Sequence, residues 1–228
     1  MRADPIVRSH SGDAAMTDAP ALQFAVEQAG VLEYAAAPTL ELQLRIDAGN
    51  ADVRSLLLNA QIRILAPARS YDDATTARLE DLFGYPADWG RNLRALHWLE
   101  RTLVVPAFTG STMVPLRIPC GYDFEVSASK YLHAVRDGVI PLELLFSGSI
   151  FFTSRDGALQ TVRLPWDREA RFDMQASLWH ELMELYFPNT AWLRVRRDVF
   201  DRLNAFRARQ IPPTWDASLE TLLRLEQP

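Results

Sequence analysis

Among the residues of this sequence that are capable of catalysis, His180, Glu181 and Glu184 come closest to a metal motif. In a helix, His180 and Glu184 project from one face because they lie four residues apart. The zincin motif HExxH uses this spacing: two imidazoles bind zinc and the glutamate acts as general base. Here Glu184 replaces the second histidine, whereas a catalytic zinc site needs three protein ligands. We therefore keep a metal-dependent hydrolase as an alternative, expect an exposed i,i+4 pair instead, and predict no metal or other cofactor.

Cys120 is the only cysteine, so the sequence excludes a disulfide framework and any multi-cysteine metal site. The thiol could act as a nucleophile with His97 or His133 as its base. Cys120 follows Val114, Leu116 and Ile118 at every second position, however, which predicts that it faces the core of a strand. A buried cysteine behaves as a small hydrophobic residue, and we predict this role for Cys120.

The basic residues are unevenly distributed, with one lysine, Lys130, against 23 arginines. Six of these arginines lie between Arg194 and Arg209 beside two aspartates, a local charge of +4 in a chain whose net charge is −5. Guanidinium groups pair bidentately with carboxylates, so this helix face could bind an acidic protein surface. The alternative is a solvated helix whose arginines pair with their own aspartates. We predict partner contacts at four of the arginines and at two tryptophans placed at element edges: Arg194, Arg196, Arg197, Arg202, Trp89 and Trp192.

Other function classes lack their sequence signatures. The chain has no P-loop, no GxGxxG motif and no GxSxG elbow. The negative net charge and the absence of an aromatic RNA-binding motif argue against nucleic acid as a partner. We find neither a signal peptide nor an apolar run of ~18 residues, so we expect a cytoplasmic protein without membrane insertion.

Apolar residues recur at every second position from Leu22 to about Trp166, which predicts strands. Residues 39–47 are the clearest case, and residues 54–64 continue the alternation after the turn residues 47–50. A hairpin is predicted around residues 154–157 because Asp-Gly favours tight turns. The short connections favour antiparallel pairing. We predict an antiparallel immunoglobulin-like β-sandwich over residues 22–166, with a partly open barrel as the alternative and a short inserted helix near 70–84.

The period becomes helical after Pro165. Leu178, Leu182 and Leu185 mark one helix, and further stripes lie between residues 195 and 206 and between 216 and 225. We predict a C-terminal helical subdomain over residues 167–228, packed on the sandwich. Residues 1–21 are polar and small, which predicts a disordered tail, and Met16 is an alternative start.

Several motifs resemble one uncharacterised family, best represented in actinobacteria and known only as a domain of unknown function. They extend over nearly the whole chain after Leu22: DLFG (81–84), WG (89–90), VPAFTG (105–110), IPCGYDFEV (118–126), IPLELLFSG (140–148), YFP (186–188), AWL (191–193) and PTWD (213–216). Genes of this family often lie beside those of actinobacterial-type uptake nickel–iron hydrogenases. The resemblance thus implies an accessory or assembly role by association, and it supplies no catalytic residues.

We therefore predict a non-enzymatic accessory protein that binds a larger protein partner, and the resemblance implies a link to nickel–iron hydrogenase. The alternatives are the metal-dependent hydrolase at His180, Glu181 and Glu184 and a homo-oligomeric structural protein that pairs through strand edges and exposed tryptophans.

Overall fold

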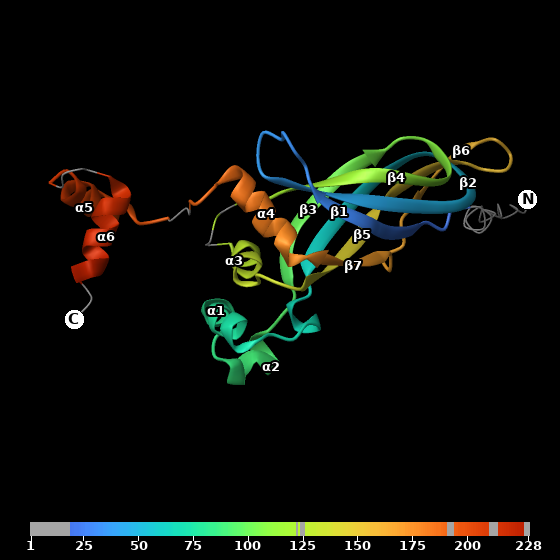
Figure 1. Ribbon diagram of the computed structural model, residues 1–228. Coiled ribbons are helices and arrows are strands. Elements are labelled where there is room, and N and C mark those ends of the chain that lie inside the picture. Colours follow the sequence, from blue (N-terminus) through green and yellow to red (C-terminus); the bar gives the residue numbers. More distant parts are fainter. Residues whose placement is uncertain (1–18, 122, 124–125, 191–193, 210–213, 226–228) are drawn as a thin grey trace, which may run out of the picture. The chain divides into compact units, whose positions relative to one another are not determined.

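The computed structural model describes residues 19–121, 123, 126–190, 194–209 and 214–225 (Figure 1). Within these residues the chain divides into two units, Met1–Thr190 and Ala191–Pro228. Unit 1 contains the strands and the first four α-helices. Unit 2 contains the helices α5 and α6.

One long strand, β2 (Thr39–Ile64), organises the sheet of unit 1. Its first half pairs with β1 (Gln23–Val31) and β4 (Phe108–Pro119), and its second half pairs with β3 (Leu96–Val105) and β5 (Val139–Thr153). All four pairings are antiparallel. Pairing with β1 and β4 stops at Asp47, pairing resumes at Asp52 and Val53, and Gly49 between them has a positive φ of 59°. The register irregularity therefore separates the two halves of a continuous strand.

The strand β5 extends the sheet on its other edge. It pairs near its end with β6 (Leu159–Arg163) and near its start with β7 (Glu169–Gln175), again antiparallel. In the described residues, seven strands thus form one hydrogen-bonded network. The predicted mostly antiparallel sheet with C-terminal helices is confirmed.

The core lies on one face of β2, as the alternation predicts. Its inward residues in both halves are fully buried: Leu40, Leu42, Leu44, Ile46, Val53, Leu56, Leu58, Ala60, Ile62 and Ile64. Phe24 of β1 stacks on Phe146 of β5, with ring centroids 4.3 Å apart. Since β1 pairs with the first half of β2 and β5 with the second, this contact joins the two halves across the core.

Three helices lie at one end of the sheet (Figure 1). They are α1 (Asp73–Phe83), the short α2 (Trp89–Asn92) and α3 (Ser127–Ala134), accompanied by the 3-10 turns Ala66–Ala68 and Pro86–Asp88. The predicted inserted helix is present as α1. Its N-cap is Asp72, whose carboxylate accepts a hydrogen bond from the Thr75 amide at 2.6 Å. Gly84 ends the helix at a positive φ of 75°.

One local prediction differs from the structure. Residues 47–50 do not separate two strands, because the backbone remains in one strand through the irregularity. Residues 109–112 (TGST) have the composition of a turn, yet they belong to β4, and the chain leaves strand structure between β3 and β4 at Pro106 and Ala107.

The predicted domain boundary at residue 166 is wrong. Residues 169–175 alternate, bury Ala170 and Met174, and form β7. The next helix, α4 (Ala176–Tyr186), buries Trp179, Leu182 and Met183 in the core of unit 1. The boundary between the two units therefore lies after Thr190. Of the predicted disordered tail, residues 1–18 lie outside the described residues.

Candidate functional site

Unit 2 carries the predicted basic helix as α5 (Arg197–Arg207), followed by α6 (Trp215–Leu225). The helices meet where the Phe200 and Trp215 rings approach to 5.5 Å between centroids. Arg207 lies over the Trp215 ring with its guanidinium carbon 4.1 Å from the centroid, a cation–π contact. These contacts fix one end of the pair of helices.

A cavity with a volume of about 430 Å³ lies against the two helices. Its lining combines apolar side chains with two guanidinium groups: Val199, Leu203, Ala205, Phe206 and Leu222, with Arg202 and Arg209. Phe200, Leu219 and Leu223 are exposed as well. The surface of unit 2 is therefore apolar and positively charged at once.

The structure separates the predicted arginines by their contacts. Arg196 forms an ion pair with Asp198 at 3.0 Å. This arginine therefore agrees with the alternative prediction, in which the arginines pair with aspartates of the same segment. Arg194, Arg197 and Arg202 are exposed, and in the described part of the chain none of them forms an ion pair. Their charges are available to a ligand.

The two predicted tryptophans have different outcomes. Trp192 lies outside the described residues. Trp89 donates its indole N–H to the Gly84 carbonyl at 2.8 Å and packs edge-on against Tyr71 and Phe83. We therefore assign Trp89 to packing between α1 and α2.

Trp166 was not among the predicted site residues, yet its side chain is 93 % exposed in the connection between β6 and β7. A tryptophan in this position is a potential interface anchor. The sequence signal was its position after Pro165, away from any apolar stripe.

His180, Glu181 and Glu184 do lie together on α4, beside a cavity of about 440 Å³. The His180 Nε2 atom lies 2.9 Å from the Val135 carbonyl oxygen and donates to it, because a carbonyl can only accept. The His180 side chain is half-buried, whereas the sequence predicted an exposed one. Among the described residues, no three histidine, cysteine or acidic side chains are grouped in a way that could hold a metal ion.

Cys120 is buried, as predicted, and burial raises the pKa of its thiol to about 12. A thiol with so high a pKa holds almost no thiolate at neutral pH, and the thiolate is the nucleophile. This geometry does not activate Cys120 for catalysis.

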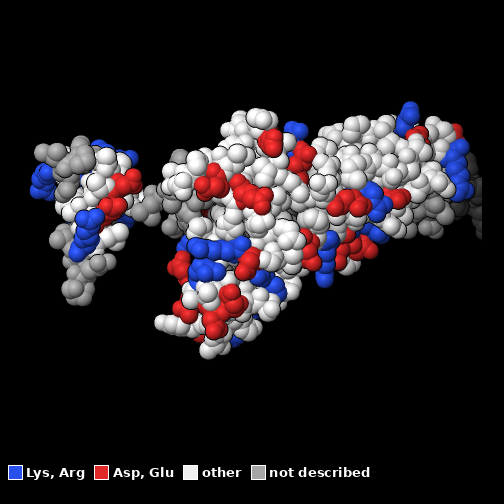
Figure 2. Space-filling view, in the orientation of Figure 1, with Lys and Arg blue, Asp and Glu red and all other residues white. Residues whose placement is uncertain are grey.

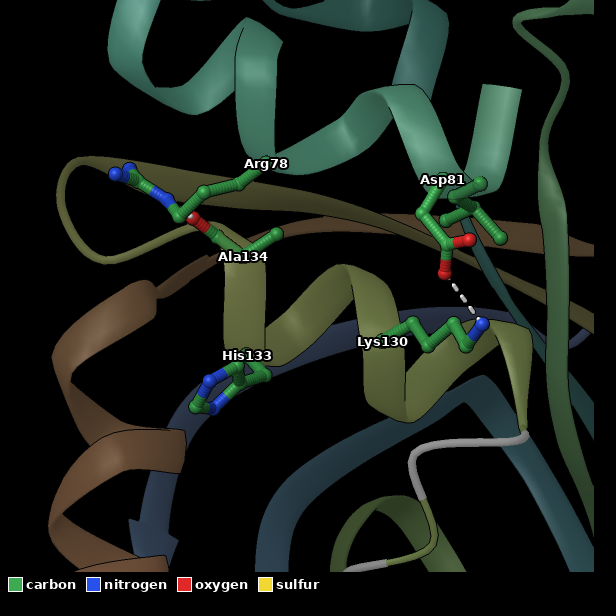
Figure 3. A pocket seen from close by; sticks show the side chains of 6 residues that line it. Arg78, Asp81, Lys130, His133 and Ala134 are labelled. Carbon is green, nitrogen blue, oxygen red and sulfur yellow. Dashed lines mark hydrogen bonds and ion pairs between the residues drawn. The ribbon is translucent and has the colours of Figure 1, made fainter. Parts of the chain in front are cut away.

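A further cavity lies between α1 and α3, where the sequence pattern indicates none (Figure 3). This cavity of about 290 Å³ is lined by Arg78, Asp81, Leu82, Lys130, His133 and Ala134. Asp81 and Lys130 form an ion pair at 2.5 Å, and Arg78 reaches from α1 to the Ala134 carbonyl at 2.8 Å. Residues 78 and 130 line one cavity only because α1 packs against α3, so only the fold reveals it.

A family model described as a family of unknown function (DUF6084) matches residues 19–228. The chain belongs to this family. The match includes both units, which agrees with the motifs that extend over nearly the whole chain. No curated protein matches this DUF6084 member.

Two solved structures resemble this DUF6084 member at low similarity. The CARDB domain of a protein from Pyrococcus furiosus, crystallised with di-metal ions, is 10 % identical, with a TM-score of 0.27 over 69 % of this chain and 94 % of that chain. β-Glucosidase 3B from Thermotoga neapolitana is 13 % identical, with a TM-score of 0.24 over 68 % of this chain and 17 % of that chain.

In the described residues, none of the helices is long and apolar enough to cross a bilayer.

Proposed function

We propose that this protein is a non-enzymatic accessory protein that binds a larger protein partner through unit 2. The observation that carries the proposal is the apolar cavity of α5 and α6 beside arginines that form no ion pair with any residue in the described part of the chain.

The packing of unit 2 supports a binding role. In its described residues no apolar side chain is fully buried, and α5 buries none at all. Units shorter than about 40 residues rarely fold on their own core, and isolated helices of 11 residues are marginal in water. A surface that would gain stability from being covered is suited to docking.

The charge defines the chemistry of the partner. Exposed Arg194, Arg197 and Arg202 favour carboxylates, while Val199, Leu203 and Phe206 favour apolar side chains. An amphipathic segment with an acidic face satisfies both requirements, and helix-in-groove recognition is a common way to bind such segments. We commit to an acidic amphipathic segment of a protein partner as the occupant.

The family resemblance names the first partner to test, a component of a bacterial nickel–iron hydrogenase or of its assembly machinery. We further infer that the two halves of β2 form the layers of an immunoglobulin-like sandwich, which would serve as a rigid scaffold for unit 2 in the cytoplasm.

The test is a pull-down from the native host with the full chain and with the double variant Arg194→Glu/Arg202→Glu. We expect the wild type to capture a hydrogenase component and the charge-reversed variant to lose it, because like charges would face each other. Arg94→Glu is the matched control, since Arg94 is exposed on unit 1 and forms no side-chain hydrogen bond or ion pair within the described residues.

Two outcomes of the pull-down would overturn the proposal. Equal capture by the wild type and the double variant would remove unit 2 from the interface. Repeated absence of any hydrogenase component would remove the named partner. A solution mass above 25.8 kDa without any partner would favour the homo-oligomer instead.

A further inference from the structure

We propose that unit 1 carries a docking surface for a basic, amphipathic segment of a protein partner, formed by the end of α4 and the loop between β1 and β2. Helix and loop lie side by side (Figure 1), and the Tyr186 hydroxyl of α4 donates to the Ala35 carbonyl of the loop at 2.8 Å. All residues of this α4 surface belong to unit 1, so the inference does not rest on the surface proposed for unit 2. A cavity of about 360 Å³ lies where helix and loop meet, and it is lined by Glu33, Tyr34, Ala35, Leu185 and Tyr186.

The loop holds an aromatic side chain in solvent with a strained backbone. Tyr34 is 98 % exposed, and its φ of 59° lies in the left-handed region, which is unfavourable for residues other than glycine. The loop is fixed at its base, where the Leu32 amide donates to the Thr39 carbonyl at 2.9 Å, and it is fixed nearer its tip by Tyr186. A ring so exposed adds little to the packing of unit 1. A ring held in a fixed position is a favourable anchor for a partner, because little entropy is lost on binding.

Leu185 places a second apolar side chain beside Tyr34. It lies in the last turn of α4, is 59 % exposed and lines the same cavity as Tyr34. Leu182 and Met183 of the same helix are buried in the core, so Leu185 lies outside the buried face of the helix. Single exposed apolar side chains are common, but two that line one cavity form a patch of the kind that marks an interaction site.

Carboxylates surround this apolar patch. Glu33 precedes Tyr34 in the loop, and Glu181 and Glu184 lie on α4. All three are exposed, and within the described residues none of them forms a side-chain hydrogen bond or an ion pair. Figure 2 shows Asp and Glu gathered over α4. These carboxylates are therefore available to lysine or arginine side chains of a partner.

The C-terminal end of α4 adds to the negative charge. A helix leaves its last carbonyls without internal partners and carries a partial negative charge there, so basic residues are favoured in the last turn and acidic residues are disfavoured. The last turn of α4 contains no basic residue and includes Glu184, whereas α5 and α6 carry Arg207 and Arg224 in their last turns. This departure from a rule of helix stability lies close to the strained Tyr34. Two such departures at one place are expected of a surface that serves binding rather than folding.

The basic groups near α4 do not neutralise the surface. His133, Arg136 and His180 line a second cavity at α4, together with Glu181 and Glu184. The cavity of Tyr34 and Leu185 has no basic residue among its lining residues. Besides the two histidines, the linings of the two cavities contain three carboxylates and one arginine, so the surface is negative as a whole.

This chemistry defines the occupant. The carboxylates and the negative end of α4 favour lysine and arginine, and the ring of Tyr34 binds the same cations through its face. Tyr34 and Leu185 favour apolar side chains, so a segment that presents basic and apolar side chains together satisfies the whole surface. The acidic segment suited to α5 and α6 would be repelled here, as would a nucleic acid or an anionic lipid surface.

The test is a fluorescence anisotropy titration of the full-length protein at low ionic strength, with a labelled amphipathic peptide of lysine and leucine as the probe. We expect saturable binding that weakens as salt is added, and weaker binding of oligolysine, which lacks apolar side chains. The same peptide made with glutamate in place of lysine tests unit 2, so the two proposals can fail separately. Absence of saturable binding by the lysine–leucine peptide would overturn the α4 surface.

Charge-reversed variants locate the binding. Glu181→Lys/Glu184→Lys should weaken binding of the lysine–leucine peptide roughly tenfold, because like charges would then face each other. Glu100→Lys/Glu169→Lys is the matched control: it changes the net charge equally, and both residues are exposed, on β3 and β7, without a side-chain bond in the described residues. An equal loss in the two double variants would mean that the peptide responds only to net charge, and the proposal would be wrong.

Tyr34→Gly tests the apolar anchor without a risk of misfolding. Glycine adopts a φ of 59° without strain, so the melting temperature should not fall, while peptide affinity should fall about tenfold through loss of the ring. Unchanged affinity in Tyr34→Gly would overturn the proposed anchor. A solution mass above 25.8 kDa that returns to the monomer value in Tyr34→Gly would identify a second copy of the chain as the occupant and contradict the proposal.

Discussion

The strand β2 and the helix α5 are both amphipathic, but their apolar residues have different surroundings. Every inward residue in the first half of β2 is covered by other strands, with Leu40, Leu42, Leu44 and Ile46 at 0 % exposure. In α5 no residue is buried, and Phe200 is 43 % exposed. The comparison teaches that apolar periodicity predicts which face of a helix or strand is suited to burial. Only the fold shows whether other parts of the same chain bury that face.

The largest expected effect is on the sheet that makes unit 1 self-sufficient. Gly148 in β5 has a φ of 149°, and a Cβ atom built on it would lie 2.0 Å from the Leu57 carbonyl oxygen of β2. We expect Gly148→Ala to destabilise unit 1 by about 4 kcal/mol or to prevent folding, because backbone atoms must separate. Urea unfolding followed by tryptophan fluorescence measures the effect.

Gly157→Ala is the matched control for this substitution. Gly157 also has a positive φ, 85°, but a Cβ atom there meets nothing within 4 Å. It should cost only about 1 kcal/mol of backbone strain. Equal losses in the two variants would contradict the steric explanation.

A pair of aromatic truncations compares the units directly. Trp179→Ala removes a side chain that is 1 % exposed in the core of unit 1 and should lower its stability by about 3–5 kcal/mol. Phe200→Ala in unit 2 should change the unfolding of unit 1 by less than about 0.5 kcal/mol, since its ring is partly in solvent. Calorimetry of each variant provides the measurement. A large loss from Phe200→Ala would mean that unit 1 depends on unit 2.

A smaller and pH-dependent effect is expected at the start of α1. Hydrogen bonds from Thr75 hold the pKa of the Asp72 carboxyl below its usual value. Because the folded-state pKa is the lower one, the stabilisation is complete above the unfolded-state value of about 3.9 and is lost as pH falls through the folded-state pKa. The difference in melting temperature between wild type and Asp72→Ala should therefore shrink as pH falls below 4. A difference that is constant with pH would show that the cap does not act through its charge.

The smallest expected effect is at Cys120, where we expect almost no alkylation of the folded protein. Cys120 should resist alkylation by iodoacetamide at pH 8 in the folded protein, because burial holds the pKa of its thiol near 12. In urea it should react at the rate of a free thiol. Rapid labelling of the folded protein would show that the chain at the end of β4 opens readily. Unit 1 would then differ less from unit 2 in how well its apolar residues are buried.

The sequence predicted most of the sheet because its signal is local. Alternation over residues 39–47 and 142–152 identifies strands without reference to the rest of the chain. The same reasoning missed β7, since Ala170, Phe172 and Met174 alternate just before a stronger helical stripe. It also placed Leu185 in the apolar stripe of α4, and this side chain is 59 % exposed.

The candidate sites depended much less on local patterns. The arginines of α5 could be found by counting charges, because they lie within one helix. The cavity of Arg78, Lys130 and His133 could not be found in this way, because its residues meet only when α1 packs against α3. The contact of His180 with the Val135 carbonyl likewise depends on tertiary packing, which a motif search does not contain.

The pairing of β2 with four other strands also constrains how the protein folds during synthesis. Because β3, β4 and β5 all follow β2 in the chain, most of its hydrogen bonds cannot form until residues far downstream have been translated. Antiparallel pairing over such sequence separations is slow compared with helix formation. Until its partner strands are translated, the apolar face of β2 is exposed on the nascent chain, and such exposure favours aggregation. We expect the nascent chain to depend on chaperones because of this exposed strand, until β5 and β7 have been translated.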